Sequence, residues 1–393
     1  MHFKFESMLN KVIHIVEARF TERDFHRYGV QNFLDKSIDV VVWDVTAVMS
    51  RKVAQSISKD IACNYKNIEY FDSKRELIKS IMRLEDSVFI LSFIPYNLNS
   101  NYIYRAISKN NIRYSLIREY SSIFVDLTNV HRSFISVIRK IILIKPVMNF
   151  LLIRMPLGFL RVRPANFVFT GGVKSNIKDP LITDKTEIVP IHTLDYDELL
   201  KGRFDSAVKF DYITFVDQDL PQHSDLISSS KPALVSKKKY YKELNEFFNY
   251  LECKYKVPVI VALHPRADLI KAKENFLGRS IFSLKTNALI KNTLFTIVHY
   301  SNAVNYCVLY KKPFVLITTN EIEAAHDNRT AAIRVLESFF SREVINLSSK
   351  EYLTKPLSID FDTESYSQYM RDYIKNNNDD IEFWDVVAKT IKF

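Results

Sequence analysis

The feature that most constrains the fold of this chain is the alternation of short, almost fully apolar runs with helical segments. KVIHIVEA (11–18), DVVVWDVTAV (39–48) and DSVFILSFI (86–94) read as strands. TERDFHRYGVQNFLDKS after the first strand reads as a helix, and another helix is expected from Asn101 to Lys109. Near-continuous apolar runs are typical of parallel strands that helices cover on both faces. Alternation of strands and helices indicates βαβ units. The sequence therefore predicts an α/β fold with parallel sheets.

A second series of the same kind begins near residue 211. Its strands read DYITFVDQ, VPVIVALHP, TLFTIVHY and PFVLITT, and SKKKYYKELNEFFNYLECKY (236–255) reads as a helix between the first two. A chain of 393 residues also exceeds the size at which one hydrophobic core usually divides. We therefore expect two Rossmann-like domains whose parallel sheets face a central cleft, where ligands bind in such folds. The expected segments are an N-terminal domain over 1–200, a C-terminal domain over 205–365, and helices over 366–393 that pack back on the N-terminal domain.

The cysteines and the N-terminus indicate a cytoplasmic protein. The three cysteines are far apart and odd in number, and none has metal-ligand spacing, so we expect reduced thiols. The N-terminal segment contains Glu6 and Glu17 and has no apolar region followed by a cleavage site, which argues against a signal peptide. No run approaches the roughly 20 apolar residues of a membrane span.

The net charge of +10 is concentrated in one segment. Residues 127–178 contain no Asp or Glu, whereas Lys and Arg alternate there with Ile, Leu, Phe and Met. One interpretation is a pair of core helices with a solvated basic face. The other is a surface that contacts anionic lipid headgroups, which would make the protein peripheral at the inner membrane. Nucleic acid is not expected as a partner, because the segment lacks an aromatic stacking platform.

Two carboxylates end the first strand of the second domain. Asp217 and Asp219 follow the apolar run YITFV and precede Pro221. The carboxyl end of a parallel strand faces the ligand crevice, so Asp217 is a candidate functional group. A loop-capping role is the alternative, and Asp219 would then solvate the turn.

Polar residues also follow two later strands of this domain. A His-Pro-Arg triplet ends one strand, and Tyr-Ser-Asn ends another and is expected to cap a helix, where backbone N–H groups attract anions. Alone, each pattern is ordinary. The candidate residues are His264, Pro265, Arg266, Tyr300, Ser301 and Asn302.

Five short motifs together resemble the retaining β-Kdo glycosyltransferase domains that build bacterial lipopolysaccharide and capsule glycans. They are VEARFTERDFHRYG, FVFTGG, YITFVDQDLPQHSD, LHPR and YSNAVNYCVLYKKP, which together span most of the chain. The Asp-Gln-x-x-Pro-x-His pattern is the most specific of them. The chain departs from the family at Ser224, where a Pro is expected. The His-Pro and Ser elements are also similar, more distantly, to those of bacterial sialyltransferases.

The resemblance implies a GT-B fold and a donor of CMP-activated 3-deoxy-D-manno-oct-2-ulosonic acid (CMP-Kdo), without a metal or another cofactor. Transfer with retention is most simply explained by two displacements, and the first needs a carboxylate nucleophile, for which Asp217 is the candidate. His264, Arg266 and the helix at Ser301 would stabilise the departing cytidine monophosphate. In this interpretation the donor-binding residues are Gln218, His223, His264, Pro265, Arg266, Tyr300, Ser301 and Asn302.

The first domain would then bind the acceptor, a lipid-linked or oligosaccharide sugar. Glu17 follows the first strand and is a candidate general base, with a salt-bridge or helix-capping role as the equal alternative. Lys174 and Arg266 could pair with the ulosonate carboxylate or could be ordinary surface cations. The other candidate acceptor contacts are Arg19, Thr170, Gly171 and Gly172.

Three competing interpretations stay open at this point. Asp217 and Asp219 also satisfy the Asp-x-Asp pattern by which GT-A glycosyltransferases hold a divalent metal. An inverting enzyme that uses CMP-sialic acid would share the same strand-end residues. A non-catalytic module, either a polysaccharide-assembly scaffold or a nucleic-acid-binding protein that uses the basic segment, would need none of these residues for chemistry.

Overall fold

The computed structural model describes residues 9–56, 63–118, 123, 144–174, 179–202, 208–221, 235–265, 267–325, 328–375 and 379–391. These residues form two compact units. Unit 1 contains the described residues up to Asp197, apart from Ile123, together with 379–391; unit 2 contains Ile123 and the described residues from Glu198 to Lys375.

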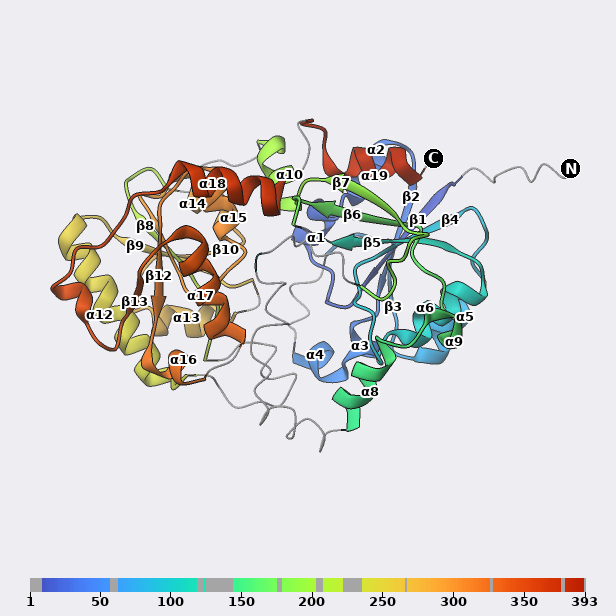
Figure 1. Ribbon diagram of the computed structural model, residues 1–393, viewed down its shortest axis with the longest axis horizontal. Helices are drawn as coiled ribbons and strands as arrows, with labels where there is room; N and C mark the ends of the chain where they lie inside the picture. The colour runs from blue at the N-terminus through green and yellow to red at the C-terminus, as the bar shows by residue number, and fades with distance from the viewer. Residues whose placement is uncertain are drawn as a thin grey trace, which may run out of the picture. The chain divides into compact units, whose positions relative to one another are not determined.

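Unit 1 is built on a seven-stranded parallel sheet with the order β3-β2-β1-β4-β5-β6-β7 (Figure 1). Its strands are β1 (Lys11–Val16), β2 (Asp39–Asp44), β3 (Ile68–Tyr70), β4 (Val88–Ser92), β5 (Arg113–Arg118), β6 (Phe167–Gly171) and β7 (Glu187–Ile191). Its helices are α1 (Glu22–Arg27), α2 (Val30–Asp35), α3 (Thr46–Met49), α4 (Arg51–Ser56), α5 (Lys74–Ile81), α6 (Asn101–Lys109), α8 (Ile144–Leu152), α9 (Leu157–Leu160) and α19 (Phe383–Ile391), and α10 (Leu194–Lys201) spans the division between the units.

The two faces of this sheet have separate cores, because successive strand residues point to opposite faces. Ile13 and Ile15 of β1 pack in one cluster with residues of α5, α6 and α8. Val12 and Val16 pack in the other cluster with residues of α2 and α19. This double burial explains why the strands read as unbroken apolar runs.

A glycine breaks the helix that the sequence predicts after the first strand. The segment forms α1 and α2, and Gly29 between them has φ +67°, in the left-handed region. A Cβ at Gly29 would overlap the ring of Trp384, which belongs to α19. The Trp384 indole N–H also donates to the carbonyl of Arg27 at 2.9 Å. The C-terminal helix therefore packs in unit 1, on a site shaped by this glycine.

Unit 2 has a six-stranded parallel sheet with the order β10-β9-β8-β11-β12-β13. Its strands are β8 (Ile213–Val216), β9 (Val259–Leu263), β10 (Ile281–Ser283), β11 (Thr296–Val298), β12 (Phe314–Thr318) and β13 (Val344–Asn346). Its helices are α12 (Lys237–Tyr255), α13 (Leu269–Asn275), α14 (Thr286–Asn292), α15 (Val304–Leu309), α16 (Asn320–Ala325), α17 (Asn328–Phe340), the 3-10 turn η3 (Glu351–Leu353), α18 (Thr363–Tyr369) and the π-helical turn η4 (Met370–Ile374).

The predicted α/β class with two parallel sheets is confirmed. The predicted cleft between the sheets stays a prediction. Of the segment 366–393, the part up to Lys375 belongs to unit 2 and the helix α19 to unit 1. None of the described helices is long and apolar enough to cross a membrane.

Candidate active site

Three neighbouring strands of unit 2 bring the candidate residues to one edge of the sheet. β8 lies between β9 and β11, and all three are parallel. Asp217 follows β8 directly, His264 follows β9, and Tyr300 lies two residues after β11. Because the carboxyl ends of parallel strands meet at one edge, these three positions are close in space.

Asp217 is a buried carboxylate. Its exposed fraction is 3%, and its Oδ1 accepts the backbone N–H of Asp219 at 3.0 Å. Its own N–H donates to the carbonyl of Ala262 on β9, also at 3.0 Å. Burial raises the pKa of Asp217 to about 7, although backbone N–H groups of Asp219 and His264 partly oppose the rise. The group is therefore divided between its neutral and ionised forms near neutral pH.

Asp219 completes an acid pair. It adopts a left-handed conformation with φ 46°, which Asp tolerates better than most residues. Burial raises its pKa to about 6, and the positive charges of Lys237 and Lys271 oppose the rise. The Asp219 side chain is half-buried, so it is less exposed to solvent than a residue that only solvates the turn would be.

Gln218 ties the ends of β8 and β11 together. Its Oε1 accepts the N–H of Tyr300 at 3.1 Å, and its Nε2 donates to the carbonyl of the same residue. These two bonds use one acceptor and one donor position of the amide. Gln218 therefore fixes the geometry of the edge, and the donor contact expected from the sequence stays a prediction.

A buried tyrosine–histidine pair lies beside Asp217, and sequence reasoning did not single it out. His299 Nδ1 lies 2.9 Å from the carbonyl of Ile317, and Nε2 lies 2.9 Å from the hydroxyl of Tyr240. A carbonyl can only accept, so Nδ1 carries the proton and Tyr240 donates to Nε2. Burial lowers the pKa of His299 to about 4. Burial, and then the charge of Asp217, raise the pKa of Tyr240.

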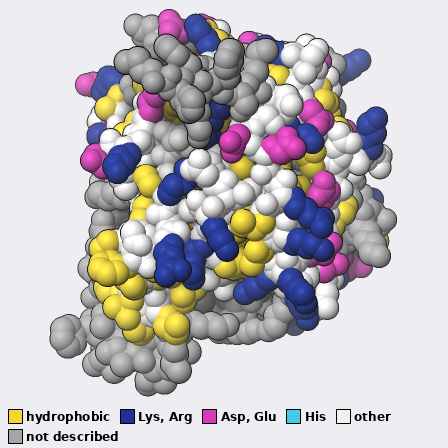
Figure 2. All heavy atoms as spheres, turned by 90° about the vertical axis from the view of Figure 1, so that its right-hand side faces the viewer, with side chains coloured by type: hydrophobic (Ala, Val, Ile, Leu, Met, Phe, Trp, Pro, Cys, Tyr) yellow, Lys and Arg dark blue, Asp and Glu magenta, His cyan; other side chains and the backbone are white. Residues whose placement is uncertain are grey.

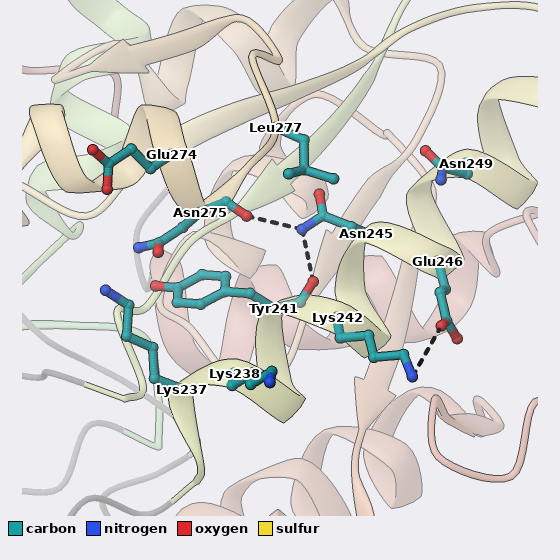
Figure 3. Close-up of a pocket in the computed structure, with 10 residues that line it drawn as sticks. All are labelled: Lys237, Lys238, Tyr241, Lys242, Asn245, Glu246, Asn249, Glu274, Asn275 and Leu277. Atoms are coloured by element: carbon teal, nitrogen blue, oxygen red, sulfur yellow. Dashed lines mark hydrogen bonds and ion pairs between the residues drawn. The ribbon is translucent and has the colours of Figure 1, made fainter.

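An open groove of about 610 Å³ lies between α12 and the end of α13 (Figure 3). Lys237, Lys238 and Lys242 line one side of it, and Glu274 and Asn275 line another. The wall includes Tyr241, whose pKa is raised by burial and then by the charges of Asp217 and Asp219. Lys237 lines the groove, and its charge also lowers the pKa of Asp219, so the groove lies near the acid pair on this side.

The residues after β9 and β11 form turns. Ala267 donates its N–H to the carbonyl of His264 at 2.9 Å, His264 is half-buried and Pro265 is exposed. Ser301 Oγ accepts the N–H of Ala303 at 3.1 Å. The predicted helix begins at Val304 with Ala303 as its N-cap, so Ser301 and Asn302 precede the cap instead of forming it. Two further candidates, His223 and Arg266, lie outside the described residues.

The candidate residues of unit 1 fall into two groups. Arg19 lies 3.6 Å from Asp44 and stacks over the ring of Tyr70 at 4.7 Å, and the nearby Glu17 is exposed. Thr170, Gly171 and Gly172 are buried at the end of β6, and Lys174 just beyond them is exposed. β4 and β5 separate β1 from β6, so about 14 Å of sheet lies between the two groups.

Within the part of the chain that the structure describes, no group of three or more His, Cys, Asp or Glu is placed to hold a metal ion.

No protein-family model and no curated protein sequence matches this chain. Solved structures do match. The wall teichoic acid polymerase TagF, solved with CDPG, has 11% identity and a TM-score of 0.51 over 98% of this chain and 88% of its own. This likeness, together with the two Rossmann-like parallel sheets, decides the architecture.

The chain has the GT-B fold. Two UDP-GlcNAc 2-epimerases also match over most of the chain, with lower scores. The enzyme of Methanocaldococcus jannaschii, in complex with UDP-GlcNAc and UDP, has 12% identity and a TM-score of 0.44 over 92% of this chain and 98% of its own. A putative epimerase of Listeria monocytogenes has 10% identity and a TM-score of 0.47 over 98% and 96%. At 11% identity the likeness to TagF concerns the fold and not the donor.

Proposed function

We propose that this GT-B protein is a glycosyltransferase that moves Kdo from CMP-Kdo to a sugar acceptor of a bacterial surface polysaccharide, with retention of configuration. The observation that carries the proposal is the arrangement of residues at the edge of the unit 2 sheet where the carboxyl ends of β8, β9 and β11 lie. There Asp217 has a raised pKa and lies beside the strand-end positions 264 and 300. Three of the five motifs that resemble β-Kdo transferases lie at these positions.

In this proposal Asp217 is the nucleophile of the first displacement. Its ionised carboxylate attacks the anomeric carbon, the bond to the phosphate oxygen of CMP breaks, and a covalent ulosonyl ester forms. The acceptor hydroxyl then displaces Asp217, and a base takes the hydroxyl proton. An exposed fraction of 3% is too small for attack, so the proposal requires that donor binding uncovers the carboxylate.

The leaving phosphate needs positive or hydrogen-bonding groups. We assign this role to the side chains and backbone N–H groups at His264, Tyr300, Ser301 and Asn302, because they follow the strands on either side of Asp217. Lys237 and Lys271 add positive charge near the acid pair. The proposed chemistry uses these groups and no metal.

The proposed acceptor side is unit 1. Glu17 is exposed after β1 and is the candidate base for the acceptor hydroxyl. Arg19, Thr170, Gly171, Gly172 and Lys174 are the other candidate contacts with the acceptor.

A second candidate function is inverting transfer from CMP-sialic acid or a related donor. One observation favours it, namely that a carboxyl group with a pKa of about 7 suits a general base at neutral pH. In that reaction Asp217 takes the proton of the acceptor hydroxyl and forms no bond to the sugar.

The test measures CMP release from CMP-Kdo and from CMP-sialic acid with a panel of sugar acceptors, and the anomeric configuration of any product by NMR. Retained configuration with CMP-Kdo supports the proposal, and inverted configuration supports the second candidate. Asp217→Asn should abolish transfer. Asp219→Asn is its matched control, since it removes the neighbouring carboxylate and leaves Asp217. Absence of turnover with both donors, in protein whose fold is verified, would contradict both candidates.

A further inference from the structure

The helices α8 and α9 of unit 1 expose a cluster of large apolar side chains. The exposed fractions are 49% for Met148, 41% for Phe150, 55% for Leu151, 44% for Met155 and 81% for Phe159. Single exposed apolar residues are ordinary, but five within twelve positions form a patch of the kind that marks an interaction surface.

The exposure does not come from a detached helix. Leu152 and Val162 are buried in the core of unit 1, and Leu157 packs against that core. Asn149 Oδ1 accepts the N–H of Leu98 at 3.0 Å, which joins α8 to the loop before α6. The segment is therefore apolar on its docked side and on its exposed side. A helix that is apolar all round is normally covered on both sides.

Positive charge accompanies the apolar side chains. Arg154 is exposed, and its guanidinium lies 3.5 Å from the centre of the Phe150 ring. Arg161, which ends α9, is also exposed. The surrounding sequence from 127 to 178 contains no carboxylate. On the face drawn in Figure 2, hydrophobic side chains lie beside Lys and Arg side chains, and Asp and Glu side chains occupy other parts of the same face.

We propose that the α8–α9 surface, formed by Met148, Phe150, Leu151, Arg154, Met155, Phe159 and Arg161, docks on an anionic lipid membrane. The apolar side chains enter the boundary between headgroups and acyl chains, and the two arginines contact lipid phosphates. Apolar burial and basic charge together give reversible but stable attachment, whereas either alone is weak. This inference does not depend on the proposed reaction.

A second copy of the chain fits this surface less well. In a two-fold dimer the same patch faces itself, so Arg154 and Arg161 would meet their own equivalents without a carboxylate from the segment. A net charge of +10 adds repulsion between copies. Anionic lipid complements both properties of the surface.

The experiment is flotation of the full chain with phosphatidylglycerol vesicles and with phosphatidylcholine vesicles. We expect binding to the anionic vesicles, reduced at about 1 M salt, where the Debye length is about 3 Å. The variant Leu151→Asp/Phe159→Asp should lower the vesicle partition coefficient by about tenfold or more, since it replaces two large apolar groups that the lipid would bury with carboxylates. The matched control is Ile270→Asp in α13, because Ile270 is 76% exposed but lies in unit 2.

Three results would overturn the inference. They are absence of binding by the unaltered chain, equal binding to the two kinds of vesicle, and equal loss in the control and the double variant. Light scattering of the same proteins tests the alternative that a second copy of the chain covers this surface. A dimer that the double variant converts to a monomer, without vesicle binding, would assign the surface to self-association. Arg154→Glu/Arg161→Glu should lower binding to anionic vesicles and leave the circular dichroism spectrum unchanged.

Discussion

The raised pKa of Asp217 predicts that Asp217→Asn changes how the stability of unit 2 depends on pH. The folded state holds the Asp217 proton up to about pH 7, whereas an unfolded chain releases it near pH 3.9. Between these values the folded state binds more protons, so its stability falls as pH rises. A difference of about 3 pKa units corresponds to about 4 kcal/mol. Asn carries no such proton, so the variant should lack this part of the pH dependence.

The assay must report unit 2 separately, and the chain offers suitable probes. Both tryptophans, Trp43 and Trp384, lie in unit 1, so their fluorescence reports unit 1. Cys307 is fully buried in unit 2, and burial raises the pKa of its thiol to about 12, which protects it from alkylation until the unit opens. Alkylation of Cys307 in increasing urea, read by peptide mass, therefore gives the free energy of unfolding of unit 2.

The expected result is a stability difference between Asp217→Asn and the unaltered chain that increases by about 4 kcal/mol from about pH 4 to about pH 8. Asp219→Asn is the matched control. Asp219 is half-buried and burial raises its pKa only to about 6, so its replacement should give a smaller pH-dependent difference. A difference for Asp217→Asn that stays constant over this range would refute the raised pKa and with it the buried setting of the carboxylate.

Two further predictions concern buried polar side chains. Neither ring nitrogen of His14 has a hydrogen-bond partner among the described residues, and burial lowers its pKa to about 3, so unit 1 should lose stability as pH falls from about 6.5. In His14→Leu the loss of unfolding free energy at pH 5, measured by tryptophan fluorescence, should be about 2 kcal/mol smaller than in the unaltered chain. An equal loss of stability in the two proteins below pH 6.5 would contradict this prediction. Tyr240→Phe leaves His299 Nε2 unpaired and should destabilise unit 2 by about 1–3 kcal/mol by Cys307 alkylation. A loss no larger than that of Tyr241→Phe would contradict the assigned hydrogen bond.

Much of the fold could be predicted from the sequence because periodicity reports burial. The predicted helix from Asn101 to Lys109 coincides with α6, and the predicted helix over 236–255 coincides with α12 within one residue. The core strands were found because burial on both faces makes them apolar throughout. The edge strands β10 and β13 were missed, since each has three residues that are not fully buried.

The remaining features depend on contacts that are distant in sequence. The break at Gly29 depends on Trp384, and the tyrosine–histidine pair joins residues 59 positions apart. Strand ends identified Asp217 as a candidate, but its burial depends on neighbours in three dimensions. The predicted role of Ser301 as a helix cap was wrong because the chain makes one more turn before the helix begins at Val304.

The most direct test of the central claim is the intact mass of the protein after incubation with CMP-Kdo in the absence of an acceptor. The proposal predicts a mass increase of one Kdo residue that persists in Asp219→Asn and is absent in Asp217→Asn, with the modified peptide containing position 217. Continued release of CMP from the donor, without any adduct on the unaltered chain, would contradict Asp217 as the nucleophile.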